Sequence, residues 1–269
     1  MSPARVYVFF GYYFTLAMFG LFGLASSLVA WMAGLLPSND RTERFFQGVI
    51  QRNFALFIAW TSFARLFHVH FHGFENLPRG RGGLVVVANH PGLTDITCLL
   101  ARLPEAVCIF KSAIRRNPVL GAAARRAGYV PNDGGHEVIR LAAAKVAAGH
   151  TLVIFPEGTR TAQGQSLSTL KPGFVLIARR AGVPIQLVRI TCTRPVLAKG
   201  RAWWKLPPLP ARQDLTLGPL IRVDSELPVT AVTRSIEEWF HSAPDFGNTA
   251  CTAAMETISS LPRGSRAPS

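Results

Sequence analysis

Acidic side chains are scarce in this chain. Aspartate and glutamate together number 15 among 269 residues, against 29 lysines and arginines, so the formal net charge at pH 7 is +14. Such an excess favours anionic partners, for which phospholipid surfaces and nucleic acids both qualify. Cysteine is also scarce, and the four thiols, at Cys98, Cys108, Cys192 and Cys251, lack the spacing of a metal or redox motif. We therefore expect free or buried thiols in a reducing compartment and no metal site.

Charge is missing altogether from a long N-terminal stretch. Between Arg5 and Asp40 lie 34 uncharged residues, rich in Phe, Leu, Val, Ala and Gly. A helix needs roughly 20 apolar residues to cross a bilayer. A cleavable signal peptide would instead have an apolar core of about 7 to 15 residues before a small-residue cleavage site, which is not evident here. We predict a retained membrane helix, which either spans the bilayer or re-enters from one leaflet.

The next segment, 41–67, mixes arginines with large apolar side chains. The residues that form this pattern are Phe46, Ile50, Phe57 and Trp60 among Arg41, Arg44, Arg52 and Arg65. The pattern favours an amphipathic helix that lies in the headgroup region, although an ordinary docking helix with a solvated face gives the same pattern. The arginines after the first helix indicate that the downstream chain stays on the cytoplasmic side.

Beyond residue 67, short apolar runs alternate with helical patterns. The expected strands cover 67–73, 83–88, 107–111, 129–131, 151–155, 184–190, 215–217 and 220–223, and the expected helices cover 94–102, 118–126, 136–148, 170–181 and 229–240. This alternation predicts an α/β fold with a mixed, largely parallel sheet flanked by helices and preceded by N-terminal membrane helices. We expect three parts: a membrane helix plus an amphipathic interfacial helix at 1–67, the α/β domain at 68–241, and a disordered tail at 242–269.

One apolar run leads directly into a histidine and an aspartate. In the segment Val-Val-Ala-Asn-His-Pro-Gly-Leu-Thr-Asp, Asn89 and His90 follow the strand, and Asp95 comes five residues after His90. Pro91 and Gly92 predict a sharp turn that brings Asp95 back to the imidazole. A histidine beside a carboxylate can take a proton from a hydroxyl near neutral pH. The alternative is that Asp95 only caps the following helix and His90 is an ordinary loop residue.

A second polar run ends another expected strand. The sequence Phe-Pro-Glu-Gly-Thr-Arg at 155–160 places Glu157, Gly158, Thr159 and Arg160 in a loop. Glu157 can bind a polyol or orient the base, Arg160 offers donors that suit phosphate, and Gly158 lets backbone amides approach a ligand. Ligands of α/β sheets gather at the carboxyl ends of the strands, where Lys111 adds a second cation. Taken singly, the loop is more often a plain turn and Lys111 a surface lysine.

Together the two runs resemble the lysophospholipid and 1-acylglycerol-3-phosphate O-acyltransferase family. The HxxxxD box of that family is present as His90 with Asp95, and its Phe-Pro-Glu-Gly-Thr-Arg box is present unaltered at 155–160. The resemblance covers roughly 69–225 as well as the N-terminal membrane-associated helices that many bacterial members carry. It implies the glycerol-phosphate acyltransferase type of fold, a mixed sheet flanked by helices.

The resemblance also implies a mechanism. His90 would be the general base, oriented by Asp95, for a lipid hydroxyl that attacks an acyl thioester of coenzyme A or acyl carrier protein. No cofactor beyond this thioester is expected, and no covalent acyl-enzyme, since the chain lacks the Gly-x-Ser-x-Gly elbow that holds a nucleophilic serine. The expected substrate-binding residues are Asn89, Lys111, Glu157, Gly158, Thr159 and Arg160, with Asn117, Pro118 and Gly121 downstream of Lys111.

Two positions depart from the family pattern. Members often carry an arginine credited with binding the acceptor phosphate in a Gly-x-x-Phe-Ile-x-Arg pattern, and here the corresponding run, 128–133, ends in Asp133. A charge reversal there would weaken phosphate binding, because a close ion pair near a protein surface is worth about 4 kcal/mol. The run 183–188 lacks the second proline of a further family box. Its Pro184 is kept and is expected to contact the acyl chain or to have a structural role.

The sequence therefore predicts a membrane-bound O-acyltransferase with its catalytic domain on the cytoplasmic face of the cytoplasmic membrane. The expected reaction converts 1-acylglycerol-3-phosphate to phosphatidic acid, with membrane lipid as a partner and acyl carrier protein as a second candidate. Asp133 keeps open the same chemistry on a different, non-glycerophosphate or specialised lipid acceptor. The alternative of another class is a membrane-anchored basic module that binds nucleic acid, which the lack of a recognised nucleic-acid motif disfavours.

Two further groups have competing interpretations. His68, His70 and His72 share one face of a strand at a spacing that can bind zinc, but no fourth ligand is near in the sequence, and a half-buried edge strand is the preferred interpretation. Trp203 and Trp204 lie between two cations. They fit either an anchor at the level of the lipid headgroups or core packing.

Overall fold

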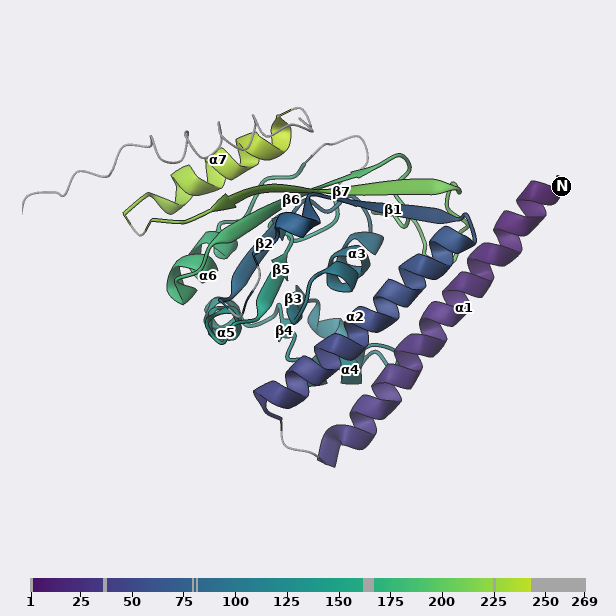
Figure 1. Cartoon of the computed structure of the whole chain (residues 1–269), viewed down its shortest axis with the longest axis horizontal. Helices are drawn as coiled ribbons and strands as arrows, with labels where there is room; N and C mark the ends of the chain where they lie inside the picture. Colours follow the sequence, from purple (N-terminus) through teal and green to yellow (C-terminus); the bar gives the residue numbers. More distant parts are fainter. Residues whose placement is uncertain are drawn as a thin grey trace, which may run out of the picture.

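Two long helices begin the computed structural model, which describes residues 2–35, 38–78, 80, 82–161, 167–224 and 226–242. These helices are α1 (Pro3–Met32) and α2 (Asp40–Phe63), and the short 3-10 helix η1 (Ala33–Leu35) follows α1. They lie side by side along one flank of the molecule (Figure 1). The predicted tail at 242–269 lies outside the described residues, apart from Ser242.

The α1 helix exposes large apolar side chains along its length. Phe10, Leu21 and Trp31 are 67%, 65% and 73% exposed, although the helix packs against α2 and the α/β domain on its other side. Among the described residues, α1 is the one helix long and apolar enough to cross a membrane. Apolar side chains on the outer face of a helix favour contact with lipid over contact with water.

Seven strands form one sheet in the order β1-β7-β6-β2-β5-β3-β4. They are β1 (Phe67–His72), β2 (Leu84–Ala88), β3 (Ala106–Phe110), β4 (Val130–Pro131), β5 (Thr151–Ile154), β6 (Ile185–Cys192) and β7 (Ala211–Ile221). Every neighbouring pair is parallel except β6 with β7. The prediction of a mixed, largely parallel sheet is therefore confirmed.

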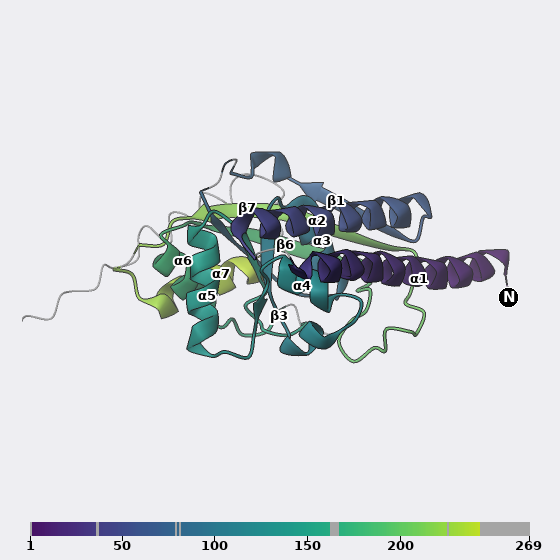
Figure 2. The same cartoon turned by 90° about the horizontal axis from the view of Figure 1, so that it is seen from below.

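Helices cover both faces of this sheet (Figures 1 and 2). They are α3 (Thr94–Arg102), α4 (Gly121–Arg126), α5 (His136–Ala147), α6 (Gly173–Ala181) and α7 (Val229–His241), with the 3-10 turns η2 (Phe74–Asn76) and η3 (Ser112–Arg116). One core lies toward α2, α3 and α4, and the other toward α5, α6 and α7. In β2, Val86 faces the first core while Val85 and Val87 face the second. Burial on both faces explains the unbroken apolar run of this strand.

Several expected elements differ in the structure, among them the helix expected at 170–181, which begins at Gly173. The short strands expected at 215–217 and 220–223 are one strand, β7, which runs through Gly218 and Pro219 and pairs with β6 through a register shift. The helix expected at 118–126 begins only at Gly121. Asn117 Oδ1 accepts hydrogen bonds from the backbone N–H groups of Val119 and Leu120, so the side chain holds a turn where the helix was expected.

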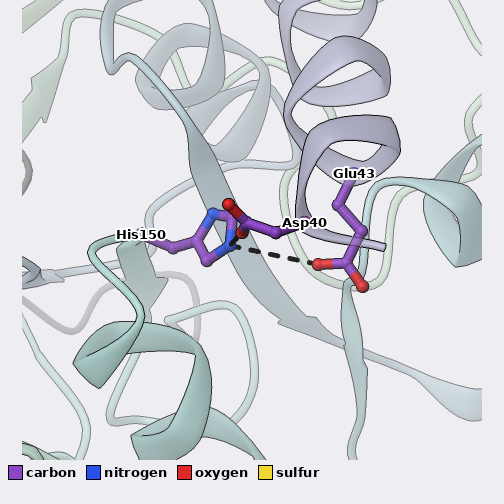
Figure 3. A group of neighbouring side chains, drawn as sticks. All are labelled: Asp40, Glu43 and His150. Carbon is purple, nitrogen blue, oxygen red and sulfur yellow. Dashed lines mark hydrogen bonds and ion pairs between the residues drawn. The ribbon is translucent and has the colours of Figure 1, made fainter. Parts of the chain in front are cut away.

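A charged cluster joins the start of α2 to the α/β domain (Figure 3). His150, just before β5, places Nε2 2.9 Å from Asp40 Oδ1 and 4.0 Å from Glu43 Oε2. Among the described residues, these three form the one group of three side chains that could hold a metal ion. Arg44 already pairs with Asp40, and Lys145 with Glu43. Because the carboxylates have these partners, the cluster is best described as an ion-pair network that docks α2.

Candidate active site

The two motif loops meet at the carboxyl ends of β2 and β5. His90 leaves the end of β2, and Asp95 lies in the first turn of α3. His90 Nδ1 lies 2.8 Å from Asp95 Oδ2, as the turn at Pro91 and Gly92 predicts. The imidazole stacks on Phe155, at the end of β5, with 4.0 Å between ring centroids and 11° between ring planes. Asp95 therefore holds the imidazole at the edge that carries Nδ1, and Phe155 covers one face of the ring.

Asp95 is fully buried and its two oxygens have three partners. Besides His90, Oδ2 accepts from the backbone N–H of Gly92 at 2.8 Å, and Oδ1 accepts from Gln213 Nε2 at 2.9 Å. Burial raises the pKa of Asp95, whereas the hydrogen bonds from His90, Gly92 and Gln213 oppose this rise. Gln213 comes from β7, and its Oε1 accepts from Thr94 Oγ1 at 3.0 Å. The glutamine thus fixes the carboxylate that orients His90.

This geometry sets the tautomer of His90. An ionised Asp95 only accepts hydrogen bonds, so Nδ1 carries the proton and Nε2 keeps its lone pair. Nε2 has no hydrogen-bond partner among the residues that the structure describes, and His90 lines a cavity. The ring can therefore accept a proton from a group bound in that cavity.

The cavity has a volume of about 590 Å³ and two kinds of wall. Apolar side chains of α1, α2, α3 and η3 line one part, among them Phe19, Phe22, Ile50, Phe54, Phe57, Leu93, Ile96 and Ile114. Cations line another part, namely Lys111, Arg160 and Lys171. The cavity thus offers both an apolar wall for a hydrocarbon chain and positive charge for an anionic group, with His90 at its wall.

Lys171 is a cavity residue that the sequence motifs did not single out. Gly158 has φ +70, and a β-carbon there would lie 3.1 Å from Lys171 Nζ, so the glycine leaves room for the ammonium group above the loop. The backbone N–H of Lys171 donates to Pro156 O at 2.9 Å, which holds the lysine beside this loop. A lysine just before a proline and a helix has no signal of its own in a single sequence.

Some expected substrate-binding residues line the cavity and others do not. Lys111, Gly158, Thr159 and Arg160 line it. Asn89 is buried and bridges to β6, donating to Ile190 O at 2.8 Å and accepting from Ile190 N at 2.7 Å. This side chain extends the sheet by one pair of hydrogen bonds, so its contacts assign it a structural role in place of the expected binding role.

Glu157 is also buried, and its two oxygens are engaged. It accepts from the backbone N–H of His90 and of Ser168, each at 2.9 Å, and from Thr161 Oγ1 at 3.0 and 2.9 Å. It is outside the cavity wall among the described residues. Glu157 therefore ties its own loop to the backbone of His90. Of its two expected roles, this contact fits the orientation of the base and not the binding of an acceptor.

The remaining expected residues have backbone roles or no contact with the cavity. Pro184 precedes β6, and its carbonyl oxygen accepts a hydrogen bond from Val85 N at 3.1 Å, which is a structural role.

The position of the phosphate-binding arginine needs a correction. In the Gly-x-x-Phe-Ile-x-Arg pattern, counting from Gly128 puts the arginine at Gly134 and not at Asp133. The expected charge reversal is therefore corrected to a missing charge.

Comparisons with known proteins agree with this site. A model of the acyltransferase family matches residues 68–191. The chain is 33% identical over 183 residues to the lyso-ornithine lipid O-acyltransferase of Pseudomonas aeruginosa, covering 66% of this chain and 67% of that protein. It is 32% identical over 159 residues to a chloroplastic 1-acyl-sn-glycerol-3-phosphate acyltransferase of Brassica napus, covering 56% of this chain and 46% of the relative. The chain spans less than half the length of that plant relative.

A solved structure shares the fold. The 1-acyl-sn-glycerophosphate acyltransferase of Thermotoga maritima aligns with a TM-score of 0.68 at 22% identity, over 97% of this chain and 100% of that one. The fold and the histidine–aspartate site define a protein of the HxxxxD acyltransferase type. The chain belongs to the acyltransferase family, as its two sequence boxes predicted.

Proposed function

We propose that this protein is a membrane-bound O-acyltransferase that moves an acyl chain from a thioester to the hydroxyl of a lysolipid. The observation that carries the proposal is the contact of His90 with buried Asp95 at the wall of a cavity that is apolar on one side and cationic on another. Lipid hydroxyl, acyl chain and anionic headgroup each find a matching wall there.

The reaction follows from the free nitrogen of His90. Nε2 takes the proton of the acceptor hydroxyl while the hydroxyl oxygen attacks the carbonyl carbon of the thioester. The new C–O bond of the ester forms and the C–S bond of the thioester breaks. The imidazolium, stabilised by Asp95, then returns the proton to the leaving thiolate. General base catalysis contributes about 100- to 10,000-fold, and positioning of the two substrates supplies the rest. Either acyl-CoA or acyl carrier protein can supply the thioester.

The first acceptor to consider is 1-acylglycerol-3-phosphate, which would give phosphatidic acid. Lys111 and Lys171 are exposed at the cavity and suit a phosphate. The relative from Brassica napus is named for this acceptor. The length and the exposed apolar side chains of α1 support membrane placement. A cytoplasmic position of the α/β domain would put the site where acyl thioesters are made.

A lysolipid without phosphate is the second candidate acceptor. The Pseudomonas aeruginosa relative is named for lyso-ornithine lipid. Gly134 stands where other members carry the phosphate-binding arginine, and Arg160 Nη1 is already engaged by Leu197 O at 2.5 Å and Ala198 O at 3.2 Å. The glycine means one cation fewer near a phosphate, and the carbonyl contacts occupy donors of Arg160 that a phosphate would need.

The test is an acylation assay of the full chain in phospholipid vesicles with acyl-CoA and a panel of acceptors. Thiol release and lipid product are measured together for 1-acylglycerol-3-phosphate, lyso-ornithine lipid and uncharged monoacylglycerol. We expect acyl transfer that His90→Ala abolishes. Full activity of His90→Ala would contradict the mechanism, and a product from lyso-ornithine lipid alone would select the second acceptor.

The two lysines distinguish phosphate binding from general attraction. For Lys111→Gln with Lys171→Gln, we expect the KM for 1-acylglycerol-3-phosphate to rise at least about 10- to 100-fold, since each hydrogen bond to a charged group is worth about 1.5 to 3 kcal/mol. The KM for monoacylglycerol should not change. The matched control is Arg234→Gln on α7, which removes an exposed cation far from the cavity.

A further inference from the structure

The segment 193–210, which joins β6 to β7, has an unusual composition. It carries four cations and no acidic residue, namely Arg194, Lys199, Arg201 and Lys205, and all four are exposed. Its two consecutive tryptophans, Trp203 and Trp204, are 56% and 57% exposed, with ring centroids 5.5 Å apart. Core packing, one of the two interpretations of these indoles, is therefore excluded. Exposed indoles among cations are typical of a surface that meets lipid headgroups.

The segment lies against the first helix. Tyr12 donates from its hydroxyl to Trp203 O at 2.5 Å, and Tyr13 donates to Trp204 O at 2.8 Å. Figure 2 shows the connection between β6 and β7 beside α1. On α1, Phe9, Phe10 and Phe14, which flank these tyrosines in sequence, are exposed. The two indoles thus add to the apolar surface of the helix that the composition assigns to the membrane.

The same segment touches the catalytic loops through its first residues. Arg160 donates to the carbonyls of Leu197 and Ala198. Val196 O lies 2.8 Å from where a β-carbon of Gly92 would be, so only glycine fits in the turn between His90 and Asp95. Leu197 has φ +57, a conformation that a leucine rarely adopts and that the arginine contact helps to hold. One short segment therefore connects the exposed tryptophans to the catalytic turn.

We propose that segment 193–210 is a second membrane-binding element, which docks on an anionic phospholipid surface with its indoles at headgroup level and its cations on the lipid phosphates. Each lysine or arginine near an anionic leaflet strengthens binding about fivefold. An acidic carrier protein would also attract the cations, but the exposed indoles beside α1 favour lipid. The membrane contact does not depend on the proposed acyl transfer. The functional connection between this segment and the catalytic turn does rest on that proposed function.

The first experiment locates the indoles in the bilayer. The full chain is reconstituted in vesicles that contain lipids brominated at shallow or deep positions of the acyl chain, and tryptophan quenching is compared with that of Trp203→Phe/Trp204→Phe. Trp31, Trp60 and Trp239 are common to both proteins, so the difference in quenching reports Trp203 and Trp204. We expect the variant to lose most of the quenching from shallow positions. Equal quenching of the two proteins would overturn the proposal.

The second experiment tests the lipid charge. Lys199→Gln/Arg201→Gln/Lys205→Gln is compared with Arg180→Gln/Arg222→Gln/Arg234→Gln, which removes three exposed cations on or near α6 and α7. In phosphatidylcholine vesicles with increasing phosphatidylglycerol, shallow quenching should rise for the wild type and the control and stay flat for the loop variant. An equal response of all three proteins would overturn the proposal.

Acyl transfer in the same vesicles separates the remaining outcomes. We expect the loop variant to lose the several-fold stimulation by anionic lipid that the control keeps. If the loop variant instead keeps its lipid response and loses at least tenfold in kcat/KM with an acyl carrier protein thioester but not with acyl-CoA, the surface binds a carrier protein and the proposal fails. Normal quenching without acyl transfer by any of the proteins would refute the proposed reaction and leave the membrane contact intact.

Discussion

His90 and His150 make nearly the same contact with an aspartate, as does the more exposed His72 with Asp214. His90 Nδ1 lies 2.8 Å from Asp95 Oδ2, and His150 Nε2 lies 2.9 Å from Asp40 Oδ1. Each pair also has a glutamine partner, because Gln213 donates to Asp95 and Gln47 Oε1 lies 3.2 Å from His150 Nδ1. The distance between imidazole and carboxylate therefore does not distinguish a general base from a docking contact.

Burial distinguishes the two pairs. The aspartate is the more buried partner in the first pair, and the histidine is the more buried partner in the second. Asp95 is fully buried and His90 is 14% exposed, whereas His150 is 1% exposed and Asp40 is 57% exposed. A buried carboxylate cannot turn toward water, so it holds the imidazole in one orientation, and the free nitrogen of His90 lies at a cavity. In the other pair both ring nitrogens face protein oxygens. A base needs a fixed carboxylate and an open nitrogen, and only the first pair has both.

Replacing each aspartate by asparagine gives the largest expected difference between the pairs. An amide can donate a hydrogen bond to Nδ1, which would move the ring proton to Nε2 and remove the base. We expect Asp95→Asn to lower kcat on the order of a thousand- to ten-thousandfold, as for the His–Asp pair of serine proteases. The matched Asp40→Asn should change kcat less than about twofold, since an exposed ion pair contributes little. A similar loss of kcat in both variants would contradict the comparison.

The sequence predicted the fold and the first pair because local patterns determine both. Short apolar runs bounded by turns give β2, β3 and β5, whose burial on both faces needs no knowledge of their partners. His90 and Asp95 are five residues apart across a Pro-Gly turn, so a local conformation brings them together. In the second pair, His150 and Asp40 are 110 positions apart in the sequence, so the pair has no local signal.

Contacts made across the sheet could not be predicted in the same way. Gln213 reaches Asp95 only because β7 pairs with β6 and β1 in one register. Its polar side chain occupies an inward position, so the apolar pattern did not indicate that the strand includes this residue. Of the two roles expected for Glu157, binding of a polyol assumed an open loop, whereas orientation of the base fits its contact with His90. Its contact with the backbone of His90 depends instead on β2 and β5 lying side by side.

The two glutamines give the next largest difference. Gln213→Leu removes a hydrogen bond that stabilises ionised Asp95, so the pKa of Asp95 should rise further. A raised pKa means that the active, ionised form is lost at a higher pH as the solution is acidified. We therefore expect the acidic limb of the kcat profile to move to higher pH, so that kcat falls most in acidic buffer and is partly restored in alkaline buffer.

The matched variant is Gln47→Leu, which leaves the ring of His150 with one partner fewer and also frees Ala127 O. It should destabilise the protein without moving the pH profile. A profile that shifts equally in both variants, or in neither, would show that Gln213 does not act through the protonation of Asp95.

The smallest effect on catalysis is expected at His150 itself. His150→Ala removes two hydrogen bonds of a buried ring and loosens the start of α2, so we expect the free energy of unfolding to fall by about 1 to 3 kcal/mol. The kcat of the folded fraction should stay within twofold of wild type at 25 °C, because no atom of this pair lines the cavity among the described residues. Thermal inactivation in detergent measures the first quantity and initial rates at low temperature measure the second. A large fall in kcat without loss of thermal stability would mean that the docking of α2 reaches the active site, because α2 also forms part of the apolar cavity wall.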